Sequence, residues 1–291
     1  MPVLHVSAQD GTQLSVRVTG IRSVDAPAVI LCDGIGCDGF VWRYLRPMLE
    51  MHCKVIHFHY RGHGLSEIPR DASTLTIEQC GRDLWTVADA CGVDQAILAG
   101  HSMGVQVVLE AAHQHPERTR AILPVCGAFE RPLDTFHGTS LGLHLLPLMS
   151  GALFRWPDGV RRFWQRSVPT ELAYWIATAT EINPHMIRRD DFLPYLRHMA
   201  RMDPVVFMGF LQNVAEHSAR SYLRHLTMPA LVVAGVNDNF TPHRLSVEMA
   251  RLLPNSELCA IPGGTHTAPL ELPELLELRL EDWSRRHGLW G

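Results

Sequence analysis

Three short runs of apolar residues recur in the first hundred residues of this chain. They are Ala28 to Cys32, Val55 to Phe58 and Ala96 to Ala99. A strand that is buried on both faces needs apolar residues at every position rather than at every second one, and such strands are typical of parallel sheets covered by helices on both sides. The runs therefore predict the centre of a parallel sheet.

The segments around these runs have the pattern that such a sheet requires. From Ile77 to Cys91 apolar residues recur at spacings of three and four, with Thr76 and Gln79 placed as a capping box and Gly92 as a stop signal. The other expected elements are an N-terminal hairpin of Val3–Ser7 and Gln13–Val18, a helix at about 105–113, and strands at 121–125, 230–234 and 258–261. Together they predict an α/β fold with a doubly wound, mostly parallel sheet of eight strands.

Residues 130–227 interrupt this alternation after the sixth strand. The segment has helical periodicity, many aromatic residues and methionines, and seven prolines, from Pro132 to Pro204. We interpret it as a helical cap inserted into a core formed by residues 1–129 and 228–291. The cap is expected to lie over the carboxyl ends of the strands, where open α/β sheets bind ligands.

Composition and charge exclude several functions. With 46% apolar and 19% charged residues and a net charge of −4, the chain is predicted to be globular. It has no run of basic residues for nucleic acid and no stretch of about 18 apolar residues that would span a membrane. The N-terminus lacks a secretory pattern, so a cytoplasmic location is expected. Seven scattered cysteines predict free buried thiols, and no cofactor or metal site is expected.

The segment Gly100-His101-Ser102-Met103-Gly104 lies between a predicted strand and a predicted helix. A serine on such a sharp turn projects its hydroxyl outward, and the two glycines let neighbouring backbone approach the turn. The N-terminus of the helix that follows favours developing negative charge. The spacing predicts that Ser102 is a nucleophile rather than part of a purely structural turn.

This motif resembles the nucleophile elbow of the α/β-hydrolase family, and the segment 58–66, Phe-His-Tyr-Arg-Gly-His-Gly-Leu-Ser, is similar to the loop after that family's fourth strand. The resemblance covers essentially the whole chain and implies the order serine, acid, histidine. It places Asp238 at the acid position and His266 at the base position. An Asx turn for Asp238 and a surface loop for His266 are the plain alternatives.

The resemblance also implies an oxyanion hole made by the backbone N–H groups of Ile35 and Met103. The sequence departs from the family at Asp33-Gly34, where many relatives have His-Gly. We expect Asp33 to be at least half-buried and hypothesise that Arg61 pairs with it, because an unpaired buried carboxylate is costly. A solvated surface turn is the alternative.

The apolar residues of the insertion indicate the substrate. Most of them are expected to pack helices together, and a few to line an acyl pocket, for which we select Leu145, Met149, Phe207 and Phe210. The predicted function is hydrolysis of largely apolar carboxylic esters through an acyl-serine intermediate, with a small-molecule ester as the partner. Lactone, thioester or carbon-carbon bond hydrolysis, acyl transfer and perhydrolysis use the same triad. A ligand sensor that keeps the fold is the alternative that is not an enzyme.

Overall fold

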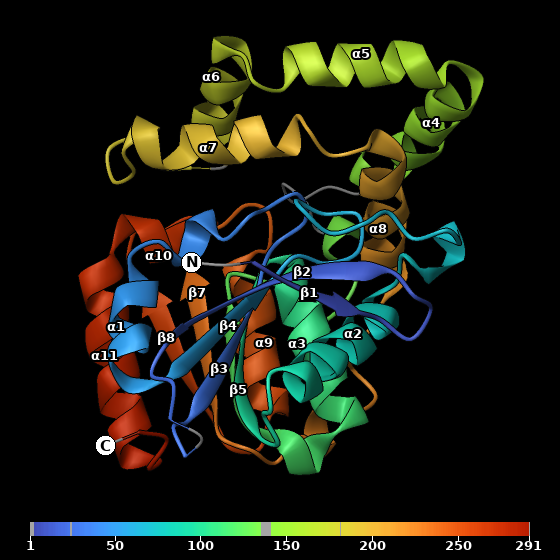
Figure 1. The fold of residues 1–291 in the computed structure, drawn as a ribbon. Coiled ribbons are helices and arrows are strands. Elements are labelled where there is room, and N and C mark those ends of the chain that lie inside the picture. Colours follow the sequence, from blue (N-terminus) through green and yellow to red (C-terminus); the bar gives the residue numbers. More distant parts are fainter. Residues whose placement is uncertain (1–2, 24, 135–140, 181, 291) are drawn as a thin grey trace.

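A computed structural model describes residues 3–23, 25–134, 141–180 and 182–290, without the side chains of 141–145, 179 and 180. Within these ranges eight strands form one sheet in the order β1-β2-β4-β3-β5-β6-β7-β8 (Figure 1). The strands are β1 (Leu4–Ser7), β2 (Gln13–Gly20), β3 (Ala28–Cys32), β4 (Lys54–Phe58), β5 (Ala96–His101), β6 (Thr119–Val125), β7 (Ala230–Gly235) and β8 (Ser256–Ile261). All eight predicted strands are confirmed.

The sheet is antiparallel only at its N-terminal edge. β1 pairs with β2, and β2 with β4, in antiparallel register, whereas the pairs from β4 to β8 are parallel. In the parallel pair β3–β5, Cys32 lies opposite Gly100. The loop after β3 and the turn after β5 therefore leave the sheet side by side, at the edge where the site forms.

Helices cover both faces of the sheet, as the apolar runs require (Figure 1). One face packs against α1 (Leu45–His52) and α11 (Pro273–Arg286), and the other against α2 (Ile77–Ala90), α3 (Met103–Gln114) and α9 (His243–Leu252). Alternate strand residues point to opposite faces of the sheet. Ile30 and Leu98 pack in the core under α2, α3 and α9, whereas Val29 and Ile97 pack in the core under α1 and α11. This confirms the doubly wound fold.

The capping box predicted for α2 forms only in part. The Thr76 side chain accepts a hydrogen bond from the Gln79 backbone N–H at 3.1 Å, and Gly92 ends the helix with a φ of 64°. The Gln79 side chain does not close the box, because the Thr76 backbone N–H donates to the Thr74 carbonyl oxygen at 2.9 Å. Gln79 Nε2 donates to the buried Asp83 carboxylate at 3.0 Å.

Among the described residues between β6 and β7 there are five α-helices, in the segment predicted to be helical. They are α4 (Leu141–Arg155), α5 (Pro157–Ser167), α6 (Glu171–Thr180), α7 (Arg189–Met199) and α8 (Pro204–Glu216). Figure 1 shows α4 to α7 beyond the upper edge of the sheet and α8 leading back to it. Val206 and Phe210 of α8 belong to the same core as α2 and α3. The insertion is thus anchored through α8.

The short helices of the described residues are α10 (Ala268–Glu271) and the 3-10 helices η1 (Phe40–Trp42), η2 (Ala72–Thr74), η3 (Pro116–Arg118), η4 (Pro132–Asp134) and η6 (Leu223–His225). In the part of the chain that the structure describes, no helix has the length and apolar character needed to cross a bilayer. All seven cysteines are free thiols, and six of them are buried, which confirms the interpretation of their spacing.

Candidate active site

Ser102 occupies the sharp turn between β5 and α3. Its backbone has φ 56° and ψ −119°, a conformation that few residues other than glycine adopt. A Cβ atom at Gly100 would lie 2.1 Å from the Gly104 carbonyl oxygen, and one at Gly104 would lie 2.2 Å from the Cys32 carbonyl oxygen. Both flanking residues must therefore be glycine, and the strained turn leaves the Ser102 hydroxyl facing a cavity.

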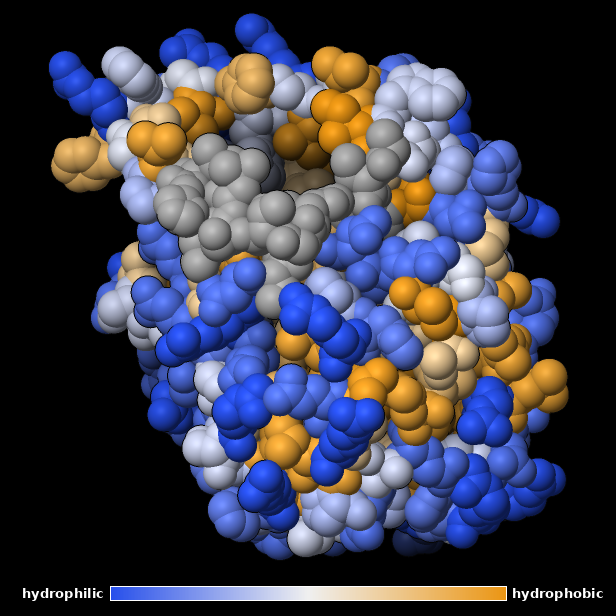
Figure 2. All heavy atoms as spheres, turned by 180° about the vertical axis from the view of Figure 1, so that it is seen from behind, coloured by the Kyte–Doolittle hydropathy of each residue, from blue (hydrophilic) through white to orange (hydrophobic). Residues whose placement is uncertain are grey.

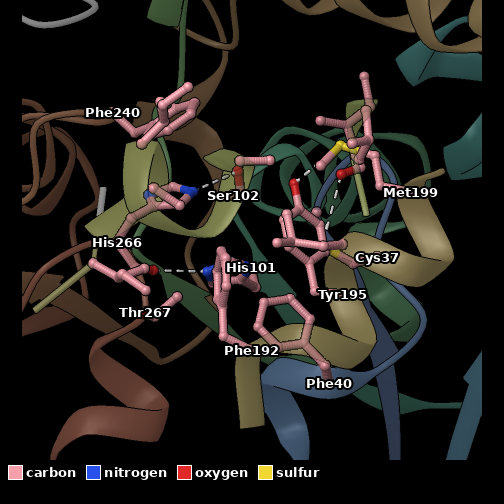
Figure 3. Close-up of a pocket in the computed structure, with 18 residues that line it drawn as sticks. Cys37, Phe40, His101, Ser102, Phe192, Tyr195, Met199, Phe240, His266 and Thr267 are labelled. Carbon is pink, nitrogen blue, oxygen red and sulfur yellow. Dashed lines mark hydrogen bonds between the residues drawn. The ribbon is translucent and has the colours of Figure 1, made fainter. Parts of the chain in front are cut away.

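His266, from the loop after β8, contacts Ser102 (Figure 3), and Asp238, from the loop after β7, contacts His266. His266 Nε2 lies 2.9 Å from Ser102 Oγ, and His266 Nδ1 lies 3.0 Å from Asp238 Oδ2. With a proton on Nδ1, the imidazole can accept the hydroxyl proton at Nε2 while the carboxylate holds the ring in that tautomer. The chain can thus activate Ser102 for attack on an acyl carbon.

The Asp238 carboxylate is buried, at 4% exposure, and is held by its own loop. Its Oδ1 atom accepts hydrogen bonds from the backbone N–H groups of Phe240 and Thr241, at 2.8 and 2.9 Å, and Oδ2 accepts one from Thr241 Oγ1 at 2.8 Å. The bond to Phe240 is an Asx turn, so the plain alternative for Asp238 holds alongside the contact with His266. The turn itself aims the carboxylate.

Glu271, which no sequence pattern indicated, holds the loop on both sides of His266. Its buried carboxylate accepts hydrogen bonds from Thr265 N at 2.6 Å, Thr265 Oγ1 at 2.5 Å and Thr267 Oγ1 at 3.1 Å. It also accepts one from the backbone N–H of Asn183, in the segment between α6 and α7, at 3.1 Å. One carboxylate therefore fixes the His266 loop and ties it to the insertion.

His101, the neighbour of Ser102, is buried and also supports the His266 loop. Its Nε2–H donates to the His266 carbonyl oxygen at 2.9 Å. Burial lowers the pKa of His101 to about 4, so the ring is neutral at pH 7. Because its N–H already serves the backbone of His266, His101 is placed to orient that loop rather than to take a proton from Ser102.

The two residues predicted to donate to the oxyanion, Met103 and Ile35, both lie close to Ser102. Met103 begins α3 directly after Ser102, and Ile35 lines the same cavity as Ser102. A Cβ atom on Gly34 would lie only 3.0 Å from Ser102 Cβ, so the β3 loop rests against the turn. Their role as donors remains a prediction that this arrangement favours.

The structure corrects the predicted partner of Asp33. Asp33 is buried, as expected, but its carboxylate binds His57 Nε2 at 2.7 Å and accepts from Trp42 Nε1 at 2.9 Å. Burial would raise the pKa of Asp33, yet the charge and hydrogen bond of His57 bring it below its ordinary value. The Arg61 guanidinium instead forms ion pairs with Asp83, at 2.8 Å, and Asp10, at 2.7 Å. The hypothesis that Arg61 pairs with Asp33 is wrong.

A cavity of about 310 Å³ opens at Ser102, within the range of small-molecule sites. Apart from Ser102, His101, His266, Thr267, Cys37 and Tyr195, its walls are apolar. Figure 3 shows aromatic rings of both the core and α7 around it, and the rings of Phe40 and Tyr195 stack at 4.9 Å. The lining residues are Gly34, Ile35, Cys37, Phe40, His101, Ser102, Val168, Ala173, Ile176, Ala177, Ile182, Phe192, Tyr195, Leu196, Met199, Phe240, His266 and Thr267.

Three of the four residues selected for the acyl pocket, Met149, Phe207 and Phe210, are not among these lining residues. Met149 is 45% exposed on α4, Phe207 packs against the Trp164 ring at 4.9 Å, and Phe210 is fully buried in the main core. The Leu145 side chain lies outside the described residues. The wall is formed instead by one face of α7, where Phe192, Leu196 and Met199 recur at helical spacing, a pattern that the sequence analysis did not weigh.

Among the described residues, no group of three or more histidine, cysteine, aspartate or glutamate side chains is arranged to hold a metal ion. His57 and His59, which share one strand end, contact each other at 5.5 Å between ring centroids, and burial lowers the pKa of His59 to about 4. The contact with Asp33 gives His57 a structural role.

The chain is similar to parts of two longer proteins. It is 28% identical to the polyketide synthase ThaQ of Burkholderia thailandensis over 90% of its own length and 12% of that protein, and 32% identical to the bifunctional epoxide hydrolase 2 of Sus scrofa over 92% of its own length and 53% of that protein. The chain thus spans only part of these relatives. The enol-lactonase of Burkholderia xenovorans LB400 superposes with a TM-score of 0.79 at 20% identity, over 97% of this chain and 100% of that one.

A family model described as alpha/beta hydrolase fold matches residues 27–273, from the first parallel strand to the start of α11. The match includes the Ser102 turn and both loops that meet it. Solved structures with this fold cover nearly the whole chain. The chain therefore belongs to the alpha/beta hydrolase fold family.

Proposed function

We propose that this protein is a carboxylic ester hydrolase that acts through an acyl-serine intermediate. The observation that carries the proposal is the hydrogen-bonded chain Ser102–His266–Asp238 at the mouth of an apolar cavity. The name of the relative from Sus scrofa, an epoxide hydrolase, states a reaction other than ester hydrolysis. Epoxide hydrolases of this fold attack with an aspartate, and the serine at position 102 favours acyl chemistry here.

In the proposed reaction, His266 Nε2 takes the proton from Ser102 Oγ as the oxygen attacks the ester carbonyl carbon. The backbone N–H groups of Ile35 and Met103 stabilise the oxyanion that forms. His266 then gives its proton to the departing alcohol, which leaves Ser102 acylated. A water molecule, deprotonated by His266, attacks the acyl carbon and releases the acid, and the proton returns to Ser102.

The walls of the cavity support an uncharged, largely apolar substrate. Because the aromatic and aliphatic side chains offer few hydrogen bonds, a charged or heavily hydroxylated group would lose its hydration there without compensation. Lactones are the second candidate, since a similar structure is an enol-lactonase and a lactone is a cyclic ester. Opening a lactone uses the same attack and leaves no separate alcohol.

We also propose that residues 130–227 act as a cap over the core made of 1–129 and 228–291. α6 and α7 supply Ala173, Ile176, Phe192, Leu196 and Met199 to the cavity wall, whereas the core supplies the reacting groups. In this proposal the core determines which reaction is catalysed, and the insertion determines which substrates fit the cavity.

A series of p-nitrophenyl esters from acetate to palmitate tests the proposal with the wild type, Ser102→Ala and the exposed control Ser73→Ala. We expect one optimum of chain length, unchanged turnover in the control, and a loss of roughly 10⁴-fold or more in Ser102→Ala. Full activity of Ser102→Ala would refute the mechanism. Tight binding of an ester without turnover by the wild type would favour a ligand sensor.

A further inference from the structure

The outer end of the insertion exposes large apolar side chains that neither the cores nor the cavity use. Every phenylalanine and tryptophan that is exposed among the described residues lies there: Phe154 at 92%, Trp156 at 65%, Phe163 at 71% and Trp175 at 65%. Leu148 and Leu172 are exposed beside them, at 71% and 69%. Large exposed apolar side chains that are collected at one end of a molecule favour an interaction surface there. Figure 2 shows apolar side chains gathered at this end of the molecule, beside a hollow.

α5 is amphipathic and forms the outer edge of the insertion (Figure 1). Its inner face is fixed, because Trp164 Nε1 donates to the Met199 carbonyl oxygen of α7 at 2.8 Å and Val160 packs in a small cluster with α4 and α8. Phe163 and Arg166 point the other way, into solvent. A helix with aromatic residues and arginines on its free face is typical of proteins that lie on a membrane surface.

The charge of this end differs from that of the whole chain. Residues 141–175 have four arginines and two acidic residues, Asp158 and Glu171, although the chain carries a net charge of −4. Glu171 is exposed and forms an ion pair with Arg189 of α7. Arg161 is used inside the insertion, in ion pairs with Asp158 and Asp203. Within the described part of the chain, Arg155, Arg162 and Arg166 are exposed and have no ionic partner. Three cations therefore stand among the exposed aromatic side chains.

We propose that this outer surface, made of Leu148, Phe154, Trp156, Phe163, Leu172, Trp175 and the three arginines, binds an anionic lipid bilayer. The arginines attract the negative headgroups, and the aromatic and aliphatic side chains enter the interfacial region. A second copy of the chain is a poorer occupant, because the same arginines would face one another across a two-fold axis. A fluid bilayer also accepts side chains that protrude as far as Phe154 without a shaped recess to receive them.

The outer surface lies next to the cavity, so binding to a bilayer would add a source of substrate to the proposed function. α6 exposes Leu172 and Trp175 while its neighbouring residues Ala173, Ile176 and Ala177 line the cavity at Ser102. Docking through this end would bring the cavity close to apolar molecules dissolved in the bilayer. The binding itself does not depend on the reaction, so it can be tested separately.

Sedimentation with vesicles of phosphatidylglycerol or of phosphatidylcholine tests the proposal on the full chain. The variants are Trp156→Ser/Phe163→Ser and Arg155→Gln/Arg162→Gln/Arg166→Gln, and the matched control is Met51→Ser/Leu278→Ser, which removes equally exposed side chains far from the insertion. We expect binding to phosphatidylglycerol that falls with added salt, a loss of affinity of roughly fivefold per arginine removed, and at least tenfold weaker binding without the two aromatic residues. The control should bind like the wild type.

Hydrolysis of a soluble ester should be unchanged in all three variants, which separates this proposal from the function proposed above. Absence of binding to phosphatidylglycerol at lipid excess would overturn it. So would equal binding of the wild type and both test variants. A concentration-dependent dimer that Trp156→Ser/Phe163→Ser abolishes, in place of vesicle binding, would show that the surface joins two copies instead.

Discussion

Glu271→Gln is expected to destabilise the protein and to slow its reaction. The carboxylate accepts hydrogen bonds from the backbone N–H of Thr265 on one oxygen and from the backbone N–H of Asn183 on the other. A glutamine has only one acceptor oxygen, so in either orientation of the amide its NH₂ group meets one of these two donors. The substitution therefore leaves a buried N–H unsatisfied and removes the charge that strengthens the remaining hydrogen bonds.

The magnitude follows from these two losses. An unsatisfied buried donor costs about 1–3 kcal/mol, and the weaker hydrogen bonds add to that, so we expect a loss of about 3 kcal/mol in the free energy of unfolding. For a chain of this size this lowers Tm by roughly 6–12 °C. Because Thr265 and Thr267 flank His266, turnover should fall about tenfold or more at 25 °C, where the variant is still folded.

Thermal unfolding followed by circular dichroism, together with kcat on the best p-nitrophenyl ester, measures both effects. Glu281→Gln on the exposed face of α11 is the control, since it makes the same chemical change without burial. If Glu271→Gln melts within about 2 °C of the control and turns over at the wild-type rate, the carboxylate does not hold the loop and the reasoning fails.

The remaining predictions concern Arg61 and Asp33. Arg61→Met leaves the buried Asp83 without its ion-pair partner and should cost about 3–5 kcal/mol in urea unfolding, whereas a loss below about 1 kcal/mol would mean that Asp83 finds another partner. The pKa of Asp33 is lower in the folded protein than in the unfolded chain, so its charge stabilises the fold above pH about 4 and that contribution is lost as the pH falls through the folded value. The stability gap between the wild type and Asp33→Asn should therefore be largest near pH 7 and shrink towards pH 3, and a gap that stays constant would contradict this.

The sequence predicts the parts of this protein that depend on local pattern. The buried strands and α2 follow from apolar spacing, because a residue's neighbours along the chain already decide whether it can be buried in a strand or a helix. The turn at Ser102 follows from glycines that the backbone cannot replace, at Gly100 and Gly104. That Asp238 and His266 meet Ser102 in one hydrogen-bonded chain was predicted from the resemblance to the α/β-hydrolase family, in which serine, acid and histidine follow in this order.

Other features depend on how segments far apart in the chain are placed against one another. The parallel register of β3 and β4 sets His57 opposite Leu31, at the end of the strand that leads to Asp33, and no local pattern distinguishes His57 from Arg61 as the partner. The role of Glu271 could not be predicted either, because its contact with the backbone of Asn183 forms only when the chain is folded.

The residues that line the cavity could not be predicted from the sequence for the same reason. The insertion offers more apolar residues than a cavity needs, and the packing of α7 and α8 on the core decides that Phe192 faces Ser102 while Phe210 is buried in the core. Sequence by itself determined the layers of the sheet and the turn at Ser102, because these rest on local burial and backbone sterics, and its resemblance to a family indicated Asp238 and His266. Only the tertiary structure decided which buried charges pair and which side chains face the cavity at Ser102, because those contacts are made across strand register and helix packing.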